Sequence, residues 1–221
     1  MQIIRYPKKE TLSKILQRPA FDSADLSAVV GTILERVKVI GDNALREYTR
    51  QFDGVEFTEF LVTENEFEEA EKKVPNELKK AIQQAKSNIE EFHKAQIEAP
   101  KVIETTPGVF CWRKSVAIEK VGLYVPAGTA PLFSTVLMLA IPAKIAGCQE
   151  IVLCSPPDRN GKINEVTLYT AMVCGVTKVF KVGGVQAIGA MTFGTESVPN
   201  VYKIFGPGNQ FVTEAKQQIS K

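Results

Sequence analysis

The run VGLYVPAGTAPLFSTVLMLAIPAKIAGCQ, residues 121–149, is the feature that most limits how this chain can fold. An apolar stretch that suits a strand is followed by a loop rich in proline and glycine, and then by an apolar segment long enough for a helix. The same order recurs three more times before the sequence ends. Because each crossover between parallel strands needs room for a helix, these units predict an α/β fold with a parallel, Rossmann-like sheet and flanking helices.

The repeated pattern gives bounds for each element. The expected strands are 122–125, 150–154, 178–182 and 202–205, and the expected helices are 134–147, 163–174, 185–193 and 209–220. The strands are short apolar runs, which is typical of parallel strands covered by helices on both faces.

The distribution of charge divides the chain near residue 120. Residues 1–120 carry 19 Lys or Arg and 20 Asp or Glu, whereas residues 121–221 carry 8 and 5. We therefore predict two domains, a mainly helical N-terminal region over 1–120 and a Rossmann-like βα domain over 121–221. In the first, Asp42 is expected to cap a helix, and Thr63 with Glu66 has the spacing of a capping box. Extended segments on either side of Pro107 and Gly108 predict a short β-ribbon.

Composition excludes several classes of function. The net charge of +2 among 221 residues gives no electrostatic basis for binding nucleic acid or a membrane surface. No apolar run approaches the roughly 20 residues that span a bilayer. The first ten residues, MQIIRYPKKE, lack the apolar core of a signal peptide, so we expect a cytoplasmic protein.

Three polar side chains follow the ends of the expected strands. Tyr124 closes the first strand, Gln186 follows the glycine pair after the third, and Asn209 follows the Gly-Pro-Gly after the fourth. The carboxyl ends of parallel strands share one edge of the sheet, and the helix N-termini there favour anionic groups such as a pyrophosphate. This arrangement could hold a nucleotide.

A simpler interpretation of the same loops stays open. Neither a GxGxxG after the first strand nor a GxxxxGK[ST] occurs in the sequence. The glycines and prolines could be ordinary turn residues, with Ser134 and Asn209 acting only as helix caps.

The cysteines and the one histidine do not have the spacing of a metal site. Cys111, Cys148, Cys154 and Cys174 are scattered without a CxxC, and His93 lies on a highly charged predicted helix. Cys154 alone stands at a strand end, but no histidine is available in that half of the chain to activate it as a nucleophile. We expect the thiols to be reduced and mainly buried.

Four segments in order along the chain resemble the histidinol dehydrogenases. They are IGDNALREYTRQFDG at 40–54, the run from 121 to 157, VGGVQAIGAMTFGT at 182–195 and YKIFGPGNQFVTEAK at 202–216. The resemblance implies an incomplete copy of the histidinol dehydrogenase fold, which is related to the aldehyde dehydrogenases. It implies an NAD-dependent and zinc-dependent oxidation of L-histidinol, through the aldehyde, to L-histidine in histidine biosynthesis, by a homodimer.

The resemblance also assigns roles to residues. In the family, the tyrosine of GLYVP, the glutamine of GGxQAI and the asparagine of GPGN contact NAD, and these are similar in position to Tyr124, Gln186 and Asn209. The family's zinc ligands and catalytic Glu–His pair come after GPGN and have no counterpart in this sequence. We therefore expect this chain to hold the NAD-binding half, with no catalytic residue and no metal ligand of its own.

Other functions remain alternatives at this stage. The chain could be a non-catalytic α/β binding or assembly module, or a paralogous member that oxidises another small alcohol with the same cofactors. A third alternative, an aldehyde dehydrogenase relative, needs an activated catalytic cysteine, and the sequence offers none with a base.

Overall fold

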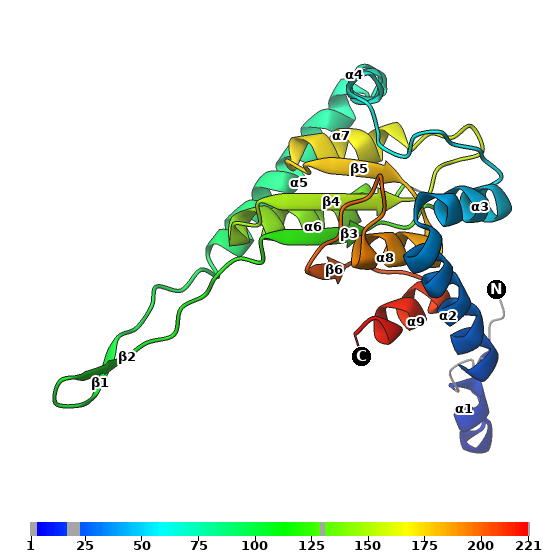
Figure 1. The fold of residues 1–221 in the computed structure, drawn as a ribbon. Helices are drawn as coiled ribbons and strands as arrows, with labels where there is room; N and C mark the ends of the chain where they lie inside the picture. Colours follow the sequence, from blue (N-terminus) through cyan, green and yellow to red (C-terminus); the bar gives the residue numbers. More distant parts are fainter. Residues whose placement is uncertain (1–3, 17–22, 129–130, 221) are drawn as a thin grey trace.

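The fold is a four-stranded parallel sheet between two layers of helices, with one long hairpin projecting from it (Figure 1). A computed structural model describes residues 4–16, 23–128 and 131–220. The expected α/β class, with a parallel sheet after a mainly helical N-terminal region, is confirmed.

The elements follow one another in the predicted order. The N-terminal region contains α1 (Lys9–Ile15), α2 (Ser23–Ile40), α3 (Asp42–Asp53), α4 (Glu64–Lys73), α5 (Asn76–Lys94), β1 (Ile103–Thr106) and β2 (Val109–Cys111). The α/β part contains β3 (Lys120–Tyr124), α6 (Phe133–Ala146), β4 (Glu150–Ser155), α7 (Glu165–Val173), β5 (Lys178–Lys181), α8 (Gly184–Phe193), β6 (Lys203–Phe205) and α9 (Gln210–Gln218).

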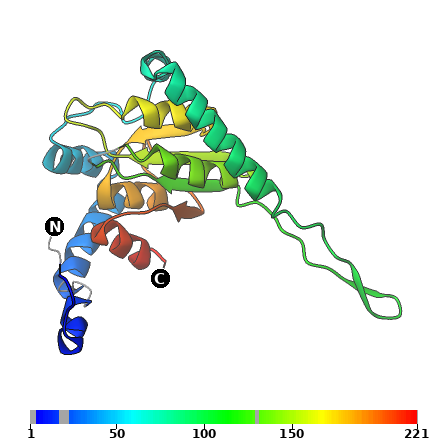
Figure 2. The same cartoon turned by 180° about the vertical axis from the view of Figure 1, so that it is seen from behind.

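Alternation along the strands produces two hydrophobic cores. Successive strand side chains point to opposite faces, so Val152 and Cys154 of β4 enter one core while Ile151 and Leu153 enter the other. The first core lies against α2, α3, α8 and α9, and the second lies against α4, α5, α6 and α7 (Figures 1 and 2). Both cores contain side chains from before and after residue 120, and the division of the chain at that residue stays a prediction.

Two local predictions about helix starts have different outcomes. Thr63 and Glu66 form the expected capping box, in which the Glu66 amide donates to Thr63 Oγ1 and the Thr63 amide donates to Glu66 Oε2. The predicted cap at Asp42 is wrong, because Gly41 precedes the helix and Asp42 is its first residue. The Asp42 carboxylate instead accepts hydrogen bonds from the backbone amide and hydroxyl of Ser197, a tertiary contact that local sequence does not show.

The predicted β-ribbon is confirmed as an antiparallel hairpin of β1 and β2. It extends well away from the body of the molecule in both views (Figures 1 and 2). Phe110 in β2 is 55% exposed, and Trp112, just after β2, is 63% exposed. The hairpin therefore presents apolar side chains outside the two cores.

Candidate functional site

The sheet reverses its direction of growth at β3. The strand order is β5-β4-β3-β6, so Leu123 of β3 pairs with Leu153 on one side and with Phe205 on the other. In open parallel sheets, ligands bind in the crevice outside the carboxyl ends of the strands at such a reversal. This topology places the candidate site where β3 and β6 end.

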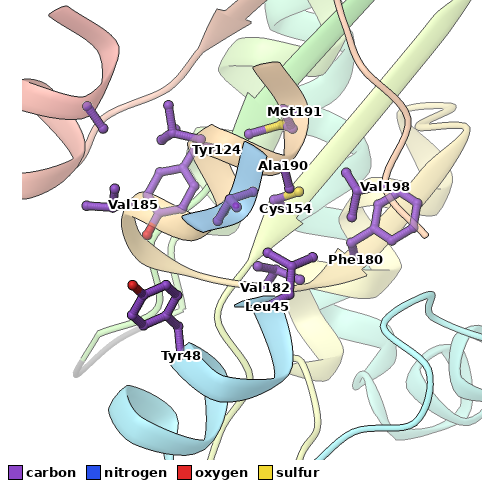
Figure 3. Close-up of a cluster of buried hydrophobic side chains, with 14 of the residues drawn as sticks. Leu45, Tyr48, Tyr124, Cys154, Phe180, Val182, Val185, Ala190, Met191 and Val198 are labelled. Atoms are coloured by element: carbon purple, nitrogen blue, oxygen red, sulfur yellow. The ribbon is translucent and has the colours of Figure 1, made fainter. Parts of the chain in front are cut away.

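Tyr124 is the last residue of β3 and points into the first core (Figure 3). Its side chain is buried, and its hydroxyl oxygen accepts a hydrogen bond of 3.0 Å from the backbone amide of Gly184, the first residue of α8. Burial raises the pKa of Tyr124, although the Gly184 hydrogen bond opposes the rise. Tyr124 therefore stays a neutral phenol and joins the end of β3 to the start of α8.

Gln186 lies in the first turn of α8 and is 1% exposed. Its Oε1 atom has no hydrogen-bond partner in the described structure. The amide folds back toward the start of the helix, since a Cβ atom built on Gly184 would lie 2.7 Å from Gln186 Oε1. A buried acceptor without a hydrogen-bond donor destabilises the folded protein. A ligand that donates a hydrogen bond to Gln186 Oε1 would remove this cost.

Asn209 has the capping role that the simpler interpretation gave it. Its Oδ1 accepts a 3.1 Å hydrogen bond from the Val212 amide at the start of α9, and its side chain is exposed. The interpretation of Ser134 as a cap is wrong, because α6 begins at Phe133 after an N-cap at Leu132 that makes no side-chain cap bond. The cap at Asn209 is compatible with a ligand nearby, since the side chain faces solvent.

The loop before Asn209 packs directly on the end of β3. A Cβ atom at Gly206 would lie only 2.1 Å from the carbonyl oxygen of Tyr124, so no larger residue fits there. Lys216 of α9 donates a 2.6 Å hydrogen bond to the Gly206 carbonyl and holds the loop. The structure thus brings the Tyr124 and Gln186 segments together at Gly184, and brings the Asn209 loop to Tyr124 through the backbone of Gly206.

A cavity of about 460 Å³ lies beside this reversal. Its walls include the loops after β3 and β4 and the charged helix α4, and they do not include Tyr124, Gln186 or Asn209. Pro156 lies between the cavity and the start of α8. It lines the cavity, and a Cβ atom built on Gly183, the residue before α8, would lie 2.4 Å from it. We place the site at the reversal rather than in the cavity alone, since the topology and the unpaired acceptor both point there.

Charged residues of α4 line this cavity, and their sequence pattern did not indicate that they belong to a site. Glu66 and Glu69 belong to an acidic run that reads as a solvated helix face. Lys181 at the end of β5 donates to Glu66 at 3.2 Å and lies 5.1 Å from the centre of the Phe57 ring. Burial alone would raise the pKa of Glu66, but the hydrogen bonds from Thr63 and Lys181 outweigh it and lower that pKa. Only the capping-box spacing signalled that Glu66 has fixed partners.

The described residues do not fit a metal site or a cysteine nucleophile. No group of three or more His, Cys, Asp or Glu side chains within 4–16, 23–128 and 131–220 could hold a metal ion. Cys154 is fully buried, and burial raises the pKa of its thiol far above the usual value. These residues therefore provide no zinc site.

Across the same residues, no helix is long and apolar enough to cross a membrane.

Together, the parallel sheet, its reversal at β3 and the glycine loops at that reversal place the chain among the doubly wound α/β proteins. Residues 16–221 match the family model described as histidinol dehydrogenase, and the chain belongs to that family.

Known proteins agree with this assignment. The chain is 59% identical over 220 residues to a histidinol dehydrogenase of Bacteroides fragilis, covering 100% of this chain and 51% of that protein. It is 53% identical over 208 residues to that of Salmonella typhimurium, covering 94% and 47%. The crystal structure of histidinol dehydrogenase from Elizabethkingia anophelis superimposes with a TM-score of 0.91 at 50% identity, covering 97% of this chain and 49% of that one. The chain spans about half the length of these relatives.

Proposed function

We propose that this chain supplies the NAD-binding part of a histidinol dehydrogenase, which oxidises L-histidinol through the aldehyde to L-histidine. The observation that carries the proposal is the unpaired, buried Oε1 of Gln186 beside the start of α8, at the reversal of the sheet. Family membership supports the proposed reaction, and the unpaired acceptor at the reversal supports the proposed place for the cofactor on this chain.

The residues at the reversal fit a dinucleotide. The N-termini of α8 and α9 present backbone amides that favour a pyrophosphate, and the glycines at 206 and 208 let the loop before α9 pack closely on Tyr124 and Val212. Gln186 would accept a hydrogen bond from the ligand, and Asn209 would contact it from the exposed start of α9. NAD, when bound, supplies the acceptor for the hydride.

Tyr124 positions the start of α8 and takes no part in the chemistry. Its hydroxyl accepts from Gly184, so it fixes the first turn of α8 and with it the position of Gln186. Because burial raises its pKa, the phenol keeps its proton at neutral pH and can donate it in a hydrogen bond to a ligand. The side chains of the first core around it exclude water from that side (Figure 3).

Other groups of the reaction would come from the rest of the whole protein. We propose that the zinc ligands and the proton-transferring residues lie after the GPGN segment, as the resemblance implies. Dimerisation and a cytoplasmic location stay predictions as well.

Titration with NAD tests the proposal. We expect the backbone amide signals of residues 124, 186 and 209 to shift in NMR spectra as NAD is added to millimolar concentration, and Gln186→Leu to weaken that binding. Ser220→Ala, at an exposed position at the end of the chain, serves as the control. Absence of any shift at these three residues would rule out the site, and turnover of histidinol by this chain alone would refute the assignment of the chemistry to the rest of the whole protein.

A further inference from the structure

Helix α3 carries two polar side chains, Thr49 and Asp53, each with one buried oxygen that has no hydrogen-bond partner among the described residues. Thr49 is completely buried and Asp53 is one helical turn further on, so both lie on the same side of the helix. Thr49 Oγ1, Asp53 Oδ2 and Gln186 Oε1 are the buried side-chain polar atoms for which the described structure has no hydrogen-bond partner. These atoms lie on α3 and α8, two helices that pack against each other.

Asp53 is close to the candidate site. Its charge is near enough to Tyr124 to contribute to the raised pKa of the phenol. Figure 3 shows the Tyr124 ring beside Val185 of α8, with its hydroxyl on the side where α3 carries Tyr48. Asp53 therefore lies on the helix that packs against α8, and its charge acts on Tyr124, whose hydroxyl accepts from the first residue of α8.

Within the described part of the chain, no ion pair joins Asp53 to a basic side chain. Arg50 pairs with Glu56 at 3.6 Å, and Arg46 lies 3.8 Å from Asp42 at the other end of α3. Burial is the cause that raises the pKa of Asp53 to about 6, and no basic group offsets it. An ionised carboxylate at this position therefore costs stability at neutral pH, which is common for groups kept for binding.

The chemistry of these atoms limits the ligand group. A carboxylate and an amide oxygen only accept hydrogen bonds, and a hydroxyl can do so too, so the group must bring several donors. A phosphate would be repelled by the carboxylate. An ammonium group would suit the charge, but the dinucleotide has none. Two adjacent hydroxyls match both oxygens of a carboxylate, and a carboxylate binds the ribose in many dinucleotide sites.

We propose that Asp53 accepts hydrogen bonds from the vicinal hydroxyls of a ribose of the bound dinucleotide, beside the unpaired oxygen of Gln186. This inference rests on the proposed function, because it places a further residue in the same NAD site. Asp53 is a binding residue in this assignment, and Thr49 lies one turn before it on the same side of α3.

Calorimetric titration of NAD into the parent chain, Asp53→Asn and Glu56→Gln at pH 8 tests the assignment. Asp53→Asn keeps the shape but loses the charge, and we expect NAD affinity to fall about tenfold, in line with the loss of one charged hydrogen bond. Glu56→Gln removes the same charge from a side chain that is 79% exposed and three residues away, and we expect unchanged affinity.

Urea unfolding of the same proteins without NAD separates binding from structure. We expect Asp53→Asn to be at least as stable as the parent at pH 8, because it no longer buries a charge. Unchanged NAD affinity in Asp53→Asn, with the parent still binding, overturns this inference and leaves the proposed function standing. A fall in affinity that is accompanied by lower stability also overturns it, since Asp53 is then structural. Failure of the parent itself to bind NAD refutes the proposed function instead.

Discussion

Gly206 provides the sharpest test of how the candidate site is built. Its φ angle is +138°, a backbone conformation that residues with a Cβ atom rarely adopt. An added Cβ would also lie 2.1 Å from the Tyr124 carbonyl oxygen and 2.9 Å from the Tyr124 carbonyl carbon. Gly206→Ala therefore combines backbone strain with a clash against backbone atoms, which cannot rotate away as a flexible side chain could.

Two other glycines separate these contributions. Gly54 has a φ of +72° and nothing within 4 Å of an added Cβ, so Gly54→Ala measures strain alone, about 1–2 kcal/mol. Gly128 also has open space around it and no positive φ, so Gly128→Ala should change stability by less than about 1 kcal/mol. For Gly206→Ala, strain of about 1–3 kcal/mol and overpacking of about 1–3 kcal/mol add to about 4 kcal/mol.

Thermal unfolding followed by circular dichroism measures the series. In a chain of this size each kcal/mol corresponds to about 2–4 °C, so we expect Gly206→Ala to lower Tm by about 10 °C and Gly54→Ala by about 4 °C. A Gly206→Ala variant no less stable than Gly54→Ala would refute the close approach of the loop to β3. The same result would show that the backbone of Gly206 does not hold the Asn209 loop at the reversal.

Three further predictions follow from single groups. Cys111 is exposed while the other three thiols are buried, so a thiol reagent should label one cysteine per native chain and four in denaturant; rapid labelling of Cys154 would contradict its burial. Lys181→Met leaves Glu66 without its ion-pair partner and should cost about 1–3 kcal/mol in urea unfolding, with part of that loss recovered in the double variant with Glu66→Gln. The folded-state pKa of Asp53, about 6, lies above its ordinary 3.8, so the free energy of unfolding of the parent should fall relative to Asp53→Asn by up to about 3 kcal/mol as pH rises from 4 to 7. A constant difference across that range would show that Asp53 titrates normally.

Predictions that depended on local pattern succeeded. The strands from Lys120–Tyr124 to Lys203–Phe205 were recognisable as apolar runs between turn residues, within one or two residues of their ends. The Thr63 capping box was also correct, because it depends on contacts between residues three apart. Asp42 failed as a cap because Ser197, 155 positions away in the sequence, provides its partners.

The candidate site was predictable only in part. Strand ends drew attention to Tyr124, Gln186 and Asn209, and the resemblance selected the same residues, but their role in binding NAD stays a proposal. The proposed role of Asp53 was not indicated by the sequence, because at the end of a helix and before a glycine it resembles an ordinary helix terminus. Its partial burial arises from tertiary packing, which no spacing in the sequence indicates.

The sequence by itself determined the order of strands and helices, the parallel class of the sheet and the family, because periodicity and turn chemistry act over a few residues. The tertiary structure decided the strand order β5-β4-β3-β6, and so the place where the sheet reverses. It also decided which polar atoms are buried without partners. Burial and pairing depend on side chains that are distant in the sequence and adjacent in space, so only the packed molecule joins Tyr124 to the start of α8 and packs α3 against α8.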